Sequence, residues 1–449
     1  MAIEICTVGG FNEVGKNCTA VKVDDEVIIL DMGLYLDKYI AYTEEDEEDI
    51  KKDMSAKKLT SIGAVPDLSL IKDWKYMTKA IVVSHAHLDH IGAIPFLAEK
   101  FSENVPVICT PYAGAILNRI LSDEKMKIPT KIRTMNPNSS VQITPNIKIE
   151  FIYMTHSIPQ TVMVLIHTKY GKVLYANDFK FDSKPTLGQK PNFERLTQLA
   201  KENVKCLILD SIYSKDAIKT PSESVAKEML NEVLLDVNNK GKGVIVTTFS
   251  SHLARLKSII ECGKKMHRKI IFCGRSLAKY VECGEDIGII NFRKDADIIG
   301  FKSKIRKKLR KISDRKHEYL VVVTGHQGEP KAVLSRIISN DIPFRLGAGD
   351  HVVFSCTTIP SPVNIQNREE LEQRLREKGV RIFKNVHVSG HAAREDHRDL
   401  IEMVKPKHII PAHGDTNMVS PMAELAAELG YKLGENVHLM QDGGRIVIE

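Results

Sequence analysis

Short apolar runs rich in valine and isoleucine recur along the first part of the chain, up to about residue 205. Several of them end in polar residues or glycine, which is typical of β-strands. Segments with the 3.6-residue period of a helix are fewer, and one of them follows His90. The pattern predicts an α/β sandwich with much antiparallel sheet. The expected strands lie in IEICTVGG, CTAVKVDDEVIILDMG, KAIVVSHAH, VPVICTP, IKIEFIYMTHS, TVMVLIHT and GKVLYANDFK.

Beyond this point, apolar strands alternate with helical segments, which predicts a parallel, doubly wound sheet. Thr220 is the expected N-cap of the first helix, because Pro221 follows it and Glu223 completes a capping box. Near residue 362 the loop TTIPSPVN interrupts the alternation, and the next helix is expected in REELEQRLREKG. The expected strands of this region include KCLILD, GVIVTT, KIIFCG, YLVVVTG and HVVFSC.

Composition narrows the class of protein. The 449 residues are 43% hydrophobic and 27% charged, as in an ordinary globular protein. No apolar stretch approaches the length of a membrane span, and the start MAIEICTVGG lacks the features of a signal peptide, so we expect a cytoplasmic protein without membrane contact. None of the eight cysteines forms a CxxC pair, and several lie in apolar runs. This favours buried, reduced thiols over disulfides or a zinc ribbon.

The net charge of +7 is too small to demonstrate a nucleic-acid partner. One segment is much more basic than the rest: residues 302–316 read KSKIRKKLRKISDRK, with an apolar stripe at Ile305, Leu309 and Ile312. Two interpretations stay open at this stage. The segment is either an ordinary solvated helix face or a ridge that faces phosphates.

The strongest chemical signal is the run His85-Ala86-His87-Leu88-Asp89-His90, which follows the apolar strand KAIVVS. Three imidazoles and a carboxylate within six residues are costly to desolvate unless they bind something. Imidazole and carboxylate ligands suit zinc. In extended chain His85 and His87 point the same way, and the turn into the next helix presents Asp89 and His90. The run therefore predicts a metal site.

One such run does not complete two coordination spheres, so further ligands are expected at other strand ends. His156 follows FIYMT, Asp178 follows VLYAN, and His413 follows HIIPA. Because His413 must reach the same metals, the end of the chain is expected to return to the first domain. The expected limits are residues 1–208 and 365–449 for the catalytic domain and residues 209–364 for an inserted domain.

These residues, with Asp31 in ILDMG, resemble the metallo-β-lactamase superfamily. The resemblance implies an αββα sandwich and two Zn²⁺ per chain, with an activated water between them. It implies one zinc bound by His85, His87 and His156, and another bound by Asp89, His90 and His413. It also implies that Asp178 bridges the two metals and that Asp31 orients the histidines.

The same metal site serves thioesterases, lactamases and nucleases, so the inserted region is more informative about the substrate. Asp210 ends CLILD, His326 follows VVVTG, and His391 follows KNVHVSG, all at strand ends. This arrangement resembles the β-CASP nucleases over essentially the whole chain, with Asp210, His326 and His391 at motifs A, B and C. DNA-processing members of the Artemis type carry valine at motif C and RNA-processing members carry histidine, so His391 favours RNA.

Within this family the chain is similar to RNase J in a short archaeal form. It starts on the first strand and ends after the last, so no N-terminal KH domains and no bacterial C-terminal domain are expected. The resemblance implies a 5′-to-3′ exoribonuclease acting on single-stranded RNA, and a homodimer. Nothing in the residues themselves separates exonuclease from endonuclease activity. The catalytic residues are expected to be Asp89, Asp210, His326 and His391.

His387, Ser389 and His391 alternate along HVSGH and so face one side of an extended strand. With the N–H of Gly390, they form a set of donors that suits a terminal phosphate. The segment His387-Val388-Ser389-Gly390-His391 is thus the expected substrate pocket, and in RNase J the matching pocket takes the 5′-monophosphate. A small-molecule hydrolase of the glyoxalase or lactamase kind would not need the insert. A non-catalytic RNA-binding subunit would have lost metal ligands, and every ligand position is filled here.

Overall fold

The computed structural model describes residues 3–44, 53–359 and 361–448. The chain folds into two compact units. The first unit comprises residues 1–181, 190–220 and 390–449, and the second comprises residues 182–189 and 221–389. The chain therefore leaves the first unit and returns to it.

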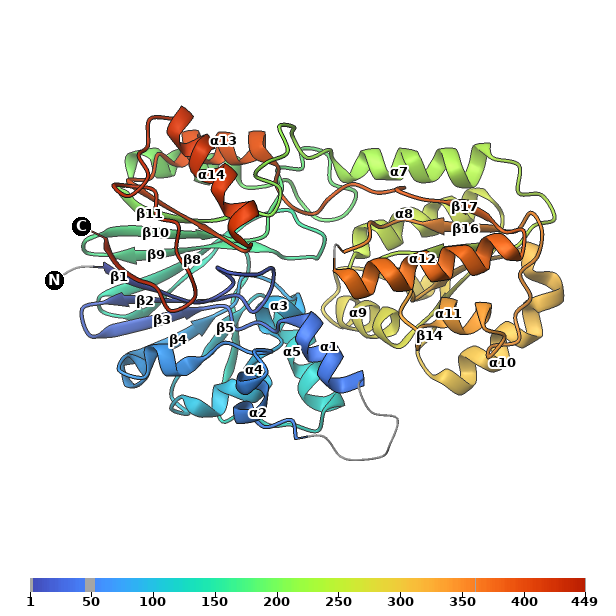
Figure 1. Ribbon diagram of the computed structural model, residues 1–449, viewed down its shortest axis with the longest axis horizontal. Helices are drawn as coiled ribbons and strands as arrows, with labels where there is room; N and C mark the ends of the chain where they lie inside the picture. The colour runs from blue at the N-terminus through green and yellow to red at the C-terminus, as the bar shows by residue number, and fades with distance from the viewer. Residues whose placement is uncertain (1–2, 45–52, 360, 449) are drawn as a thin grey trace. The chain divides into compact units, whose positions relative to one another are not determined.

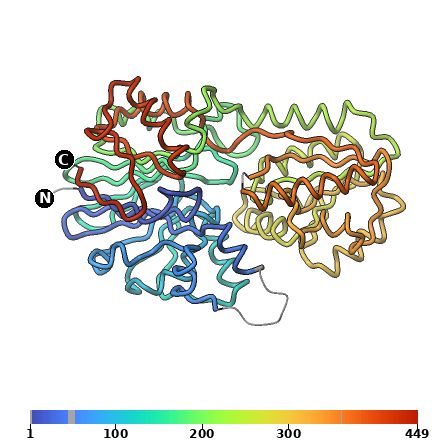
Figure 2. Tube along the Cα trace, in the orientation of Figure 1, coloured from blue at the N-terminus to red at the C-terminus, as the bar shows by residue number. Residues whose placement is uncertain are grey.

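Two sheets form the first unit. The first sheet has the order β19 (Arg445–Ile448), β1 (Ile3–Gly9), β2 (Cys18–Val23), β3 (Glu26–Leu30), β4 (Thr78–Val82), β5 (Val107–Cys109) and β6 (Ile132–Thr134). The second has the order β18 (His408–Ala412), β11 (Val204–Asp210), β10 (Gly171–Ala176), β9 (Val162–Thr168), β8 (Ile147–Tyr153) and β7 (Ser140–Thr144). The first and last strands of the chain are neighbours, because β19 pairs with β1 (Figure 2).

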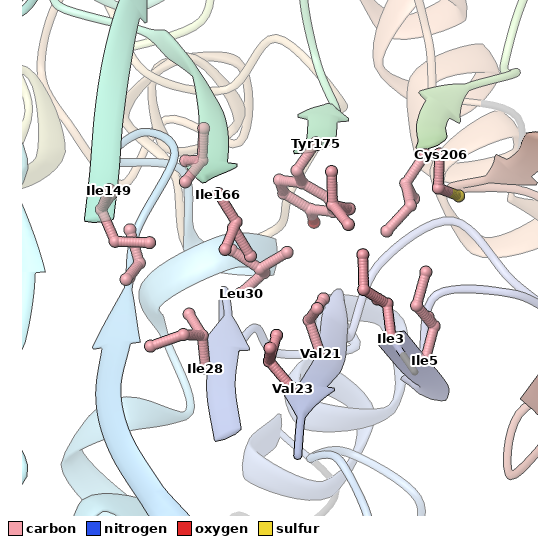
Figure 3. Close-up of a cluster of buried hydrophobic side chains, with 14 of the residues drawn as sticks. Ile3, Ile5, Val21, Val23, Ile28, Leu30, Ile149, Ile166, Tyr175 and Cys206 are labelled. Atoms are coloured by element: carbon pink, nitrogen blue, oxygen red, sulfur yellow. The ribbon is translucent and has the colours of Figure 1, made fainter. Parts of the chain in front are cut away.

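The core of this unit lies between the two sheets (Figure 3). Ile28 and Val21 of the first sheet meet Ile149, Ile166 and Tyr175 of the second, and all five are buried. The alternation of apolar and polar residues in β8 produces this arrangement, because one face of the strand points inward. Burying a large aliphatic side chain contributes about 1.5–3 kcal/mol.

Helices cover the outer faces of both sheets, which confirms the expected α/β sandwich (Figure 1). A second apolar cluster joins the outer face of the second sheet to α6, α13 and α14. The helices of this unit are α1 (Leu36–Glu44), α2 (Ala56–Ser61), α3 (Leu88–Ile91), α4 (Ile94–Leu97), α5 (Pro111–Asp123), α6 (Phe193–Gln198), α13 (Arg394–Val404) and α14 (Thr416–Glu428). No helix in the described ranges is both long and apolar enough to cross a membrane.

The second unit contains a six-stranded sheet whose paired strands all run parallel, as the alternation of strands and helices predicted. Its central strands are buried along their whole length, which explains their continuous apolar sequences. The order is β14 (Ala296–Ile299), β13 (Lys269–Cys273), β15 (Tyr319–Val323), β12 (Val244–Thr247), β16 (His351–Phe354) and β17 (Arg381–Phe383). The helices are α7 (Glu223–Asn231), α8 (Leu253–Lys265), α9 (Arg275–Asp286), α10 (Lys302–Ile312), α11 (Val333–Ile338) and α12 (Pro362–Glu377).

The structure differs from the sequence expectations at two helix starts. The N-cap of α7 is Ser222, and Thr220 instead donates its hydroxyl to the carbonyl oxygen of His391 at 2.7 Å. Helix α12 begins at Pro362 with Ser361 as N-cap, inside the segment expected to be a loop. Strand β17 then pairs with β16, and the second unit extends to residue 389. The sequence had placed its end at residue 364.

All eight cysteines are buried and free, as their apolar surroundings indicated. A buried ion pair is less expected: Arg255 of α8 is 0% exposed and binds Glu223 through two hydrogen bonds of 2.5 and 2.9 Å. Arg255 also donates to Ser355 and to the carbonyl oxygen of Val386. This arginine therefore joins α7, α8, β16 and the segment that follows β17.

Substitution of Arg255 by methionine should lower the free energy of unfolding by about 3 kcal/mol, because it leaves His252 as the one cationic partner of the buried Glu223 carboxylate among the described residues. Urea unfolding followed by circular dichroism measures this change in the free energy of unfolding. Arg374→Met, which breaks an exposed helix pair with Glu370, is the matched control and should change stability by less than about 0.5 kcal/mol. Equal losses in both variants would contradict the prediction.

Candidate active site

The predicted ligands lie at the carboxyl ends of strands in both sheets of the first unit. Strands β10, β11 and β18 are neighbours and parallel, so Asp178, Asp210 and His413 emerge at one edge. β8 has the same direction as β10, because both are antiparallel to β9, and His156 follows it. In the first sheet, β4 leads into the loop that carries His85. Ligand sites in α/β sheets commonly form at such edges.

Three groups of ligand-type atoms meet at this edge, each within 4.8 Å of one another and each including Asp178. One of them is Asp178, Asp210 and His391, and the other two contain the predicted metal ligands. The first of these two is His85, His87, His156 and Asp178, and the second is Asp89, His90, Asp178 and His413. These are the seven residues that the sequence singled out as metal ligands. They come from segments up to several hundred residues apart, and the fold brings them together.

The spacing of the ligand atoms suits a tetrahedral metal ion. His87 Nδ1 lies 3.1 Å from both His85 Nε2 and His156 Nε2. Asp178 Oδ2 lies 3.3 Å from His85 Nε2 and 3.4 Å from His156 Nε2. A tetrahedral site with bonds of about 2.0–2.1 Å has ligand atoms about 3.3–3.4 Å apart. These residues therefore fit a cation in both spacing and chemistry.

The second group has a similar geometry. His90 Nε2 lies 3.4 Å from Asp178 Oδ2 and 3.5 Å from Asp89 Oδ2. His413 Nε2 lies 3.5 Å from Asp178 Oδ1. That oxygen is buried and has no hydrogen-bond partner among the described residues. A bound cation would satisfy it, since a buried carboxylate oxygen without a partner is costly.

The charge distribution in the site also favours a bound cation. Burial lowers the pKa of His85 and His156 and brings that of His87 to about 3, so these imidazoles are neutral, as metal ligands must be. Burial also disfavours the charged form of His90, but Asp178, Asp89 and Asp31 outweigh it and raise its pKa well above the usual value. The carboxylates thus attract positive charge to this position, which a metal ion would supply.

Asp31 contacts His90 and Ser84 beside the ligand groups, and its role in orienting the histidines stays a prediction. Its Oδ2 lies 2.7 Å from His90 Nδ1, and its Oδ1 accepts the backbone N–H of Ser84 at 2.7 Å. Asp31, Asp178 and His413 all have positive φ, at 58°, 32° and 60°. Left-handed backbone is strained for such residues and collects at functional sites. Gly33 of the same motif is needed for space, because a Cβ there would lie 1.6 Å from the carbonyl oxygen of Asp89.

Sequence reasoning missed a set of residues that orient the ligands. The Asn17 side-chain oxygen lies 2.7 Å from His413 Nδ1, which leaves Nε2 to face Asp178. Asn177 donates to the same oxygen at 3.0 Å, and the Tyr175 hydroxyl donates to Asp31 at 3.0 Å. The only available signal was position, since Asn177 and Tyr175 share a strand end with Asp178.

His391 and Asp210 lie beside the ligand groups. His391 Nδ1 is 3.0 Å from Asp210 Oδ2, and its Nε2 is 4.0 Å from Asp178 Oδ2. Burial opposes protonation of His391, but Asp178 and Asp210 outweigh it and raise its pKa to about 9. Bound cations would offset the charge of Asp178 and bring this pKa down. Because Nδ1 of His391 faces Asp210, Nε2 is the ring nitrogen that can exchange a proton.

His326 and His387 belong to the second unit. The His326 ring packs edge-on against Phe249 with centroids 4.4 Å apart, and burial lowers its pKa. The centroids of the His387 and Phe249 rings are 6.2 Å apart, and His387 Nδ1 lies 3.3 Å from Arg255 Nη1. The participation of His326 in the metal site stays a prediction.

Comparison with known families and proteins agrees with this site. Residues 73–234 match the beta-lactamase superfamily domain, residues 241–370 match the Ribonuclease J beta-CASP domain, and residues 371–440 match the Zn-dependent metallo-hydrolase RNA specificity domain. A crystal structure of a protein of unknown function from Enterococcus faecalis V583 superposes with a TM-score of 0.66 over 100% of both chains, at 18% identity. At that identity, the likeness shows the fold alone.

Named relatives match along the whole chain. Ribonuclease J of Methanocaldococcus jannaschii is 45% identical over 99% of this chain and 98% of its own length. Ribonuclease J of Pyrococcus abyssi is 44% identical over 98% of this chain and 96% of its own length. Ribonuclease J 1 of Streptococcus pyogenes is 31% identical over 98% of this chain and 73% of its own. The metallo-β-lactamase domain, the inserted β-CASP domain and these full-length matches show that the chain belongs to the Ribonuclease J family of metallo-hydrolase nucleases.

Proposed function

We propose that this protein is a zinc-dependent ribonuclease that degrades 5′-monophosphorylated, single-stranded RNA from its 5′ end. The observation that carries the proposal is the pair of ligand groups sharing Asp178, with the His391–Asp210 pair beside them. A ligand set of imidazoles and carboxylates suits zinc. The match to a Zn-dependent RNA specificity domain supports both the metal and the substrate.

The residues that would hold two zinc ions are the two groups described above. Bound there, the ions would lower the pKa of a water molecule and neutralise charge on the scissile phosphate. Asp178 belongs to both groups and so sets their separation. Asp31 and Asn17 fix the ring orientations of His90 and His413, which determines the nitrogen that each offers.

His391 would supply a proton to the leaving oxygen or stabilise charge there. Asp210 accepts a hydrogen bond from Nδ1–H, so the ring orientation is set and Nε2 faces the edge that carries Asp178. Thr220 donates to the backbone carbonyl of His391 and restrains the residue from the other side. Asp89 completes the ligand set, and His326 would support the phosphate by hydrogen bonding.

The 5′-phosphate would bind along residues 387–391. Gly390 anchors this segment to the metal site, because its carbonyl oxygen lies 2.7 Å from His156 Nδ1. A Cβ at Gly390 would lie 2.8 Å from that of Ser157, so only glycine allows this approach. Arg255 restrains His387 at the other end. We propose that a phosphate bound by His387 and Ser389 lies about one nucleotide from the scissile bond, a spacing that would give stepwise removal of nucleotides.

Digestion of 5′-monophosphorylated RNA labelled at its 5′ end tests the proposal. Release of labelled mononucleotide is the expected result. Labelled fragments would instead identify an endonuclease and overturn the exonuclease assignment. Hydrolysis of a thioester without hydrolysis of RNA would overturn the nuclease assignment. Addition of a chelator should stop the reaction, and zinc should restore it.

The double substitution His387→Ala and Ser389→Ala should reduce the preference for 5′-monophosphate over 5′-hydroxyl ends by about 100-fold or more, because two hydrogen bonds to a charged group are lost. The ratio of kcat/KM for the two RNAs measures this preference. His317→Ala combined with Ser339→Ala, both exposed in the same unit, is the control. An unchanged preference would move the pocket elsewhere, for example to TTFSS at 247–251 or CGRS at 273–276.

A further inference from the structure

Helix α10 and the turn after it hold the largest concentration of positive charge in the chain. Residues 302–316 contain nine lysines and arginines and one aspartate, a net charge of +8, whereas the whole protein carries +7. The remainder of the chain is thus close to neutral. The excess of positive charge belongs to one helix of the second unit (Figure 1).

The structure shows which face of α10 carries this charge. Ile305, Leu309 and Ile312 are buried against the parallel sheet. The opposite face presents Lys304, Lys307, Arg310 and Lys311, all exposed. In the described part of the chain, no carboxylate lies within ion-pair distance of these four. Two other cations of the helix, Arg306 and Lys308, are paired with Asp341 and Asp297. The outward face is therefore an unneutralised set of four cations, called the α10 face below.

This arrangement disfavours the helix when nothing is bound. Lys307 and Lys311 are four residues apart, and Lys304 and Lys307 are three apart, so like charges are neighbours on the surface. Each such pair costs about 0.2–0.5 kcal/mol. The first turn contains no acidic residue to offset the helix dipole. A polyanion along the α10 face would relieve both costs.

An aromatic ring borders the α10 face. Phe301, the N-cap of the helix, is 69% exposed. Lys304 Nζ lies 5.3 Å from the centre of its ring. An exposed phenylalanine among lysines is the combination that binds single-stranded nucleic acid, because bases stack on the ring while cations contact the phosphates. α10 also follows β14 at the carboxyl edge of the sheet, where the loops after β12 and β15 lie.

We infer that the α10 face is a docking surface for the phosphate backbone of single-stranded RNA, with Phe301 as a stacking platform. The inference rests on the proposed function insofar as RNA is the partner. It goes beyond that function, because the α10 residues belong neither to the metal site nor to the segment 387–391. It decides between the two interpretations that the sequence left open for residues 302–316.

Binding measured against salt concentration tests this inference. The probe is a phosphorothioate-linked oligouridylate, which keeps the phosphate charge and resists cleavage, with the metal-loaded protein. Substitution of Lys304, Lys307, Arg310 and Lys311 by glutamine should reduce the slope of log Kd against log salt by about 3, at about 0.7 per lost phosphate contact. Over a fourfold rise in salt, this amounts to about a 50-fold difference in Kd. The expected kcat at saturating RNA is unchanged.

The matched control removes the same charge from dispersed, exposed lysines of the first unit: Lys100, Lys127, Lys131 and Lys201. It should leave the slope as in the unmodified protein. Phe301→Ala should weaken binding about 5- to 100-fold without changing the slope, because stacking involves no counterion release.

An unchanged slope in the α10 variant overturns the inference and leaves an acidic protein as the partner to test. Equal changes in the control would show a general charge effect and would also overturn it. Binding and cleavage are measured separately, so failure of the proposed ribonuclease activity would be recognised as absence of product with RNA still bound.

Discussion

Replacing Asp178 by alanine is expected to reduce turnover of RNA by about 10³-fold or more and to leave the protein folded. Asp178 belongs to both ligand groups, and its Oδ2 lies within 3.4 Å of His85, His90 and His156 nitrogens. If the two groups hold metal ions, as proposed, the substitution would remove a ligand from both sites, and the charge stabilisation that such ions would supply is worth several kcal/mol. Zinc content after dialysis and kcat on monophosphorylated RNA are the two measurements.

Asp24→Ala is a suitable control for this experiment. Asp24 is also an aspartate with positive φ, 53°, but it lies in the turn between β2 and β3. The control reports the cost of placing alanine in left-handed backbone without affecting the ligands. Unaltered far-UV circular dichroism in both variants would show that the fold persists. Full zinc content with normal turnover in Asp178→Ala would contradict the assignment.

Replacing His391 by alanine should lower kcat by about 10²–10⁴-fold, the usual contribution of a positioned acid or base. The geometry supports this role: Asp210 holds Nδ1 at 3.0 Å, and Nε2 is directed toward the ligand groups. Because the residue would act in the transition state, the Kd for RNA should change little. Single-turnover kinetics and direct binding separate the two effects.

Two further variants sharpen the result. Asp210→Asn should give a smaller loss of kcat than His391→Ala, since it disturbs the orientation of the imidazole and leaves the ring in place. His408→Ala removes a histidine of the same unit that stacks on His438 away from the ligand groups, and it should have no effect on kcat. A loss of affinity as large as the loss of kcat for His391→Ala would indicate a binding or folding role.

Local sequence determined the two sheet types and pointed to the residues that the structure gathers into candidate ligand groups. Strands were visible because burial on one face gives alternation, as in β8, and burial on both faces gives continuous apolar runs, as in β15. Ligands were visible because a cluster of histidine and aspartate just after apolar strands is costly to bury unless it binds something. His85 to His90 and the distant His156, Asp178 and His413 were found in this way, and the structure brings all of them together.

Tertiary contacts decided what local patterns do not encode. Asn17 was not recognised, because its contact with His413 joins residues 396 positions apart and leaves no periodicity in the sequence. Thr220 looked like a helix cap, but its hydroxyl binds the backbone of His391, 171 positions away. The second unit extends to residue 389 because β17 pairs with β16, and hydrogen bonds between strands depend on a neighbour that the segment itself does not specify. The basic character of α10 was plain in the sequence, yet only the tertiary structure showed which of its faces is buried and which of its cations lie beside carboxylates among the described residues.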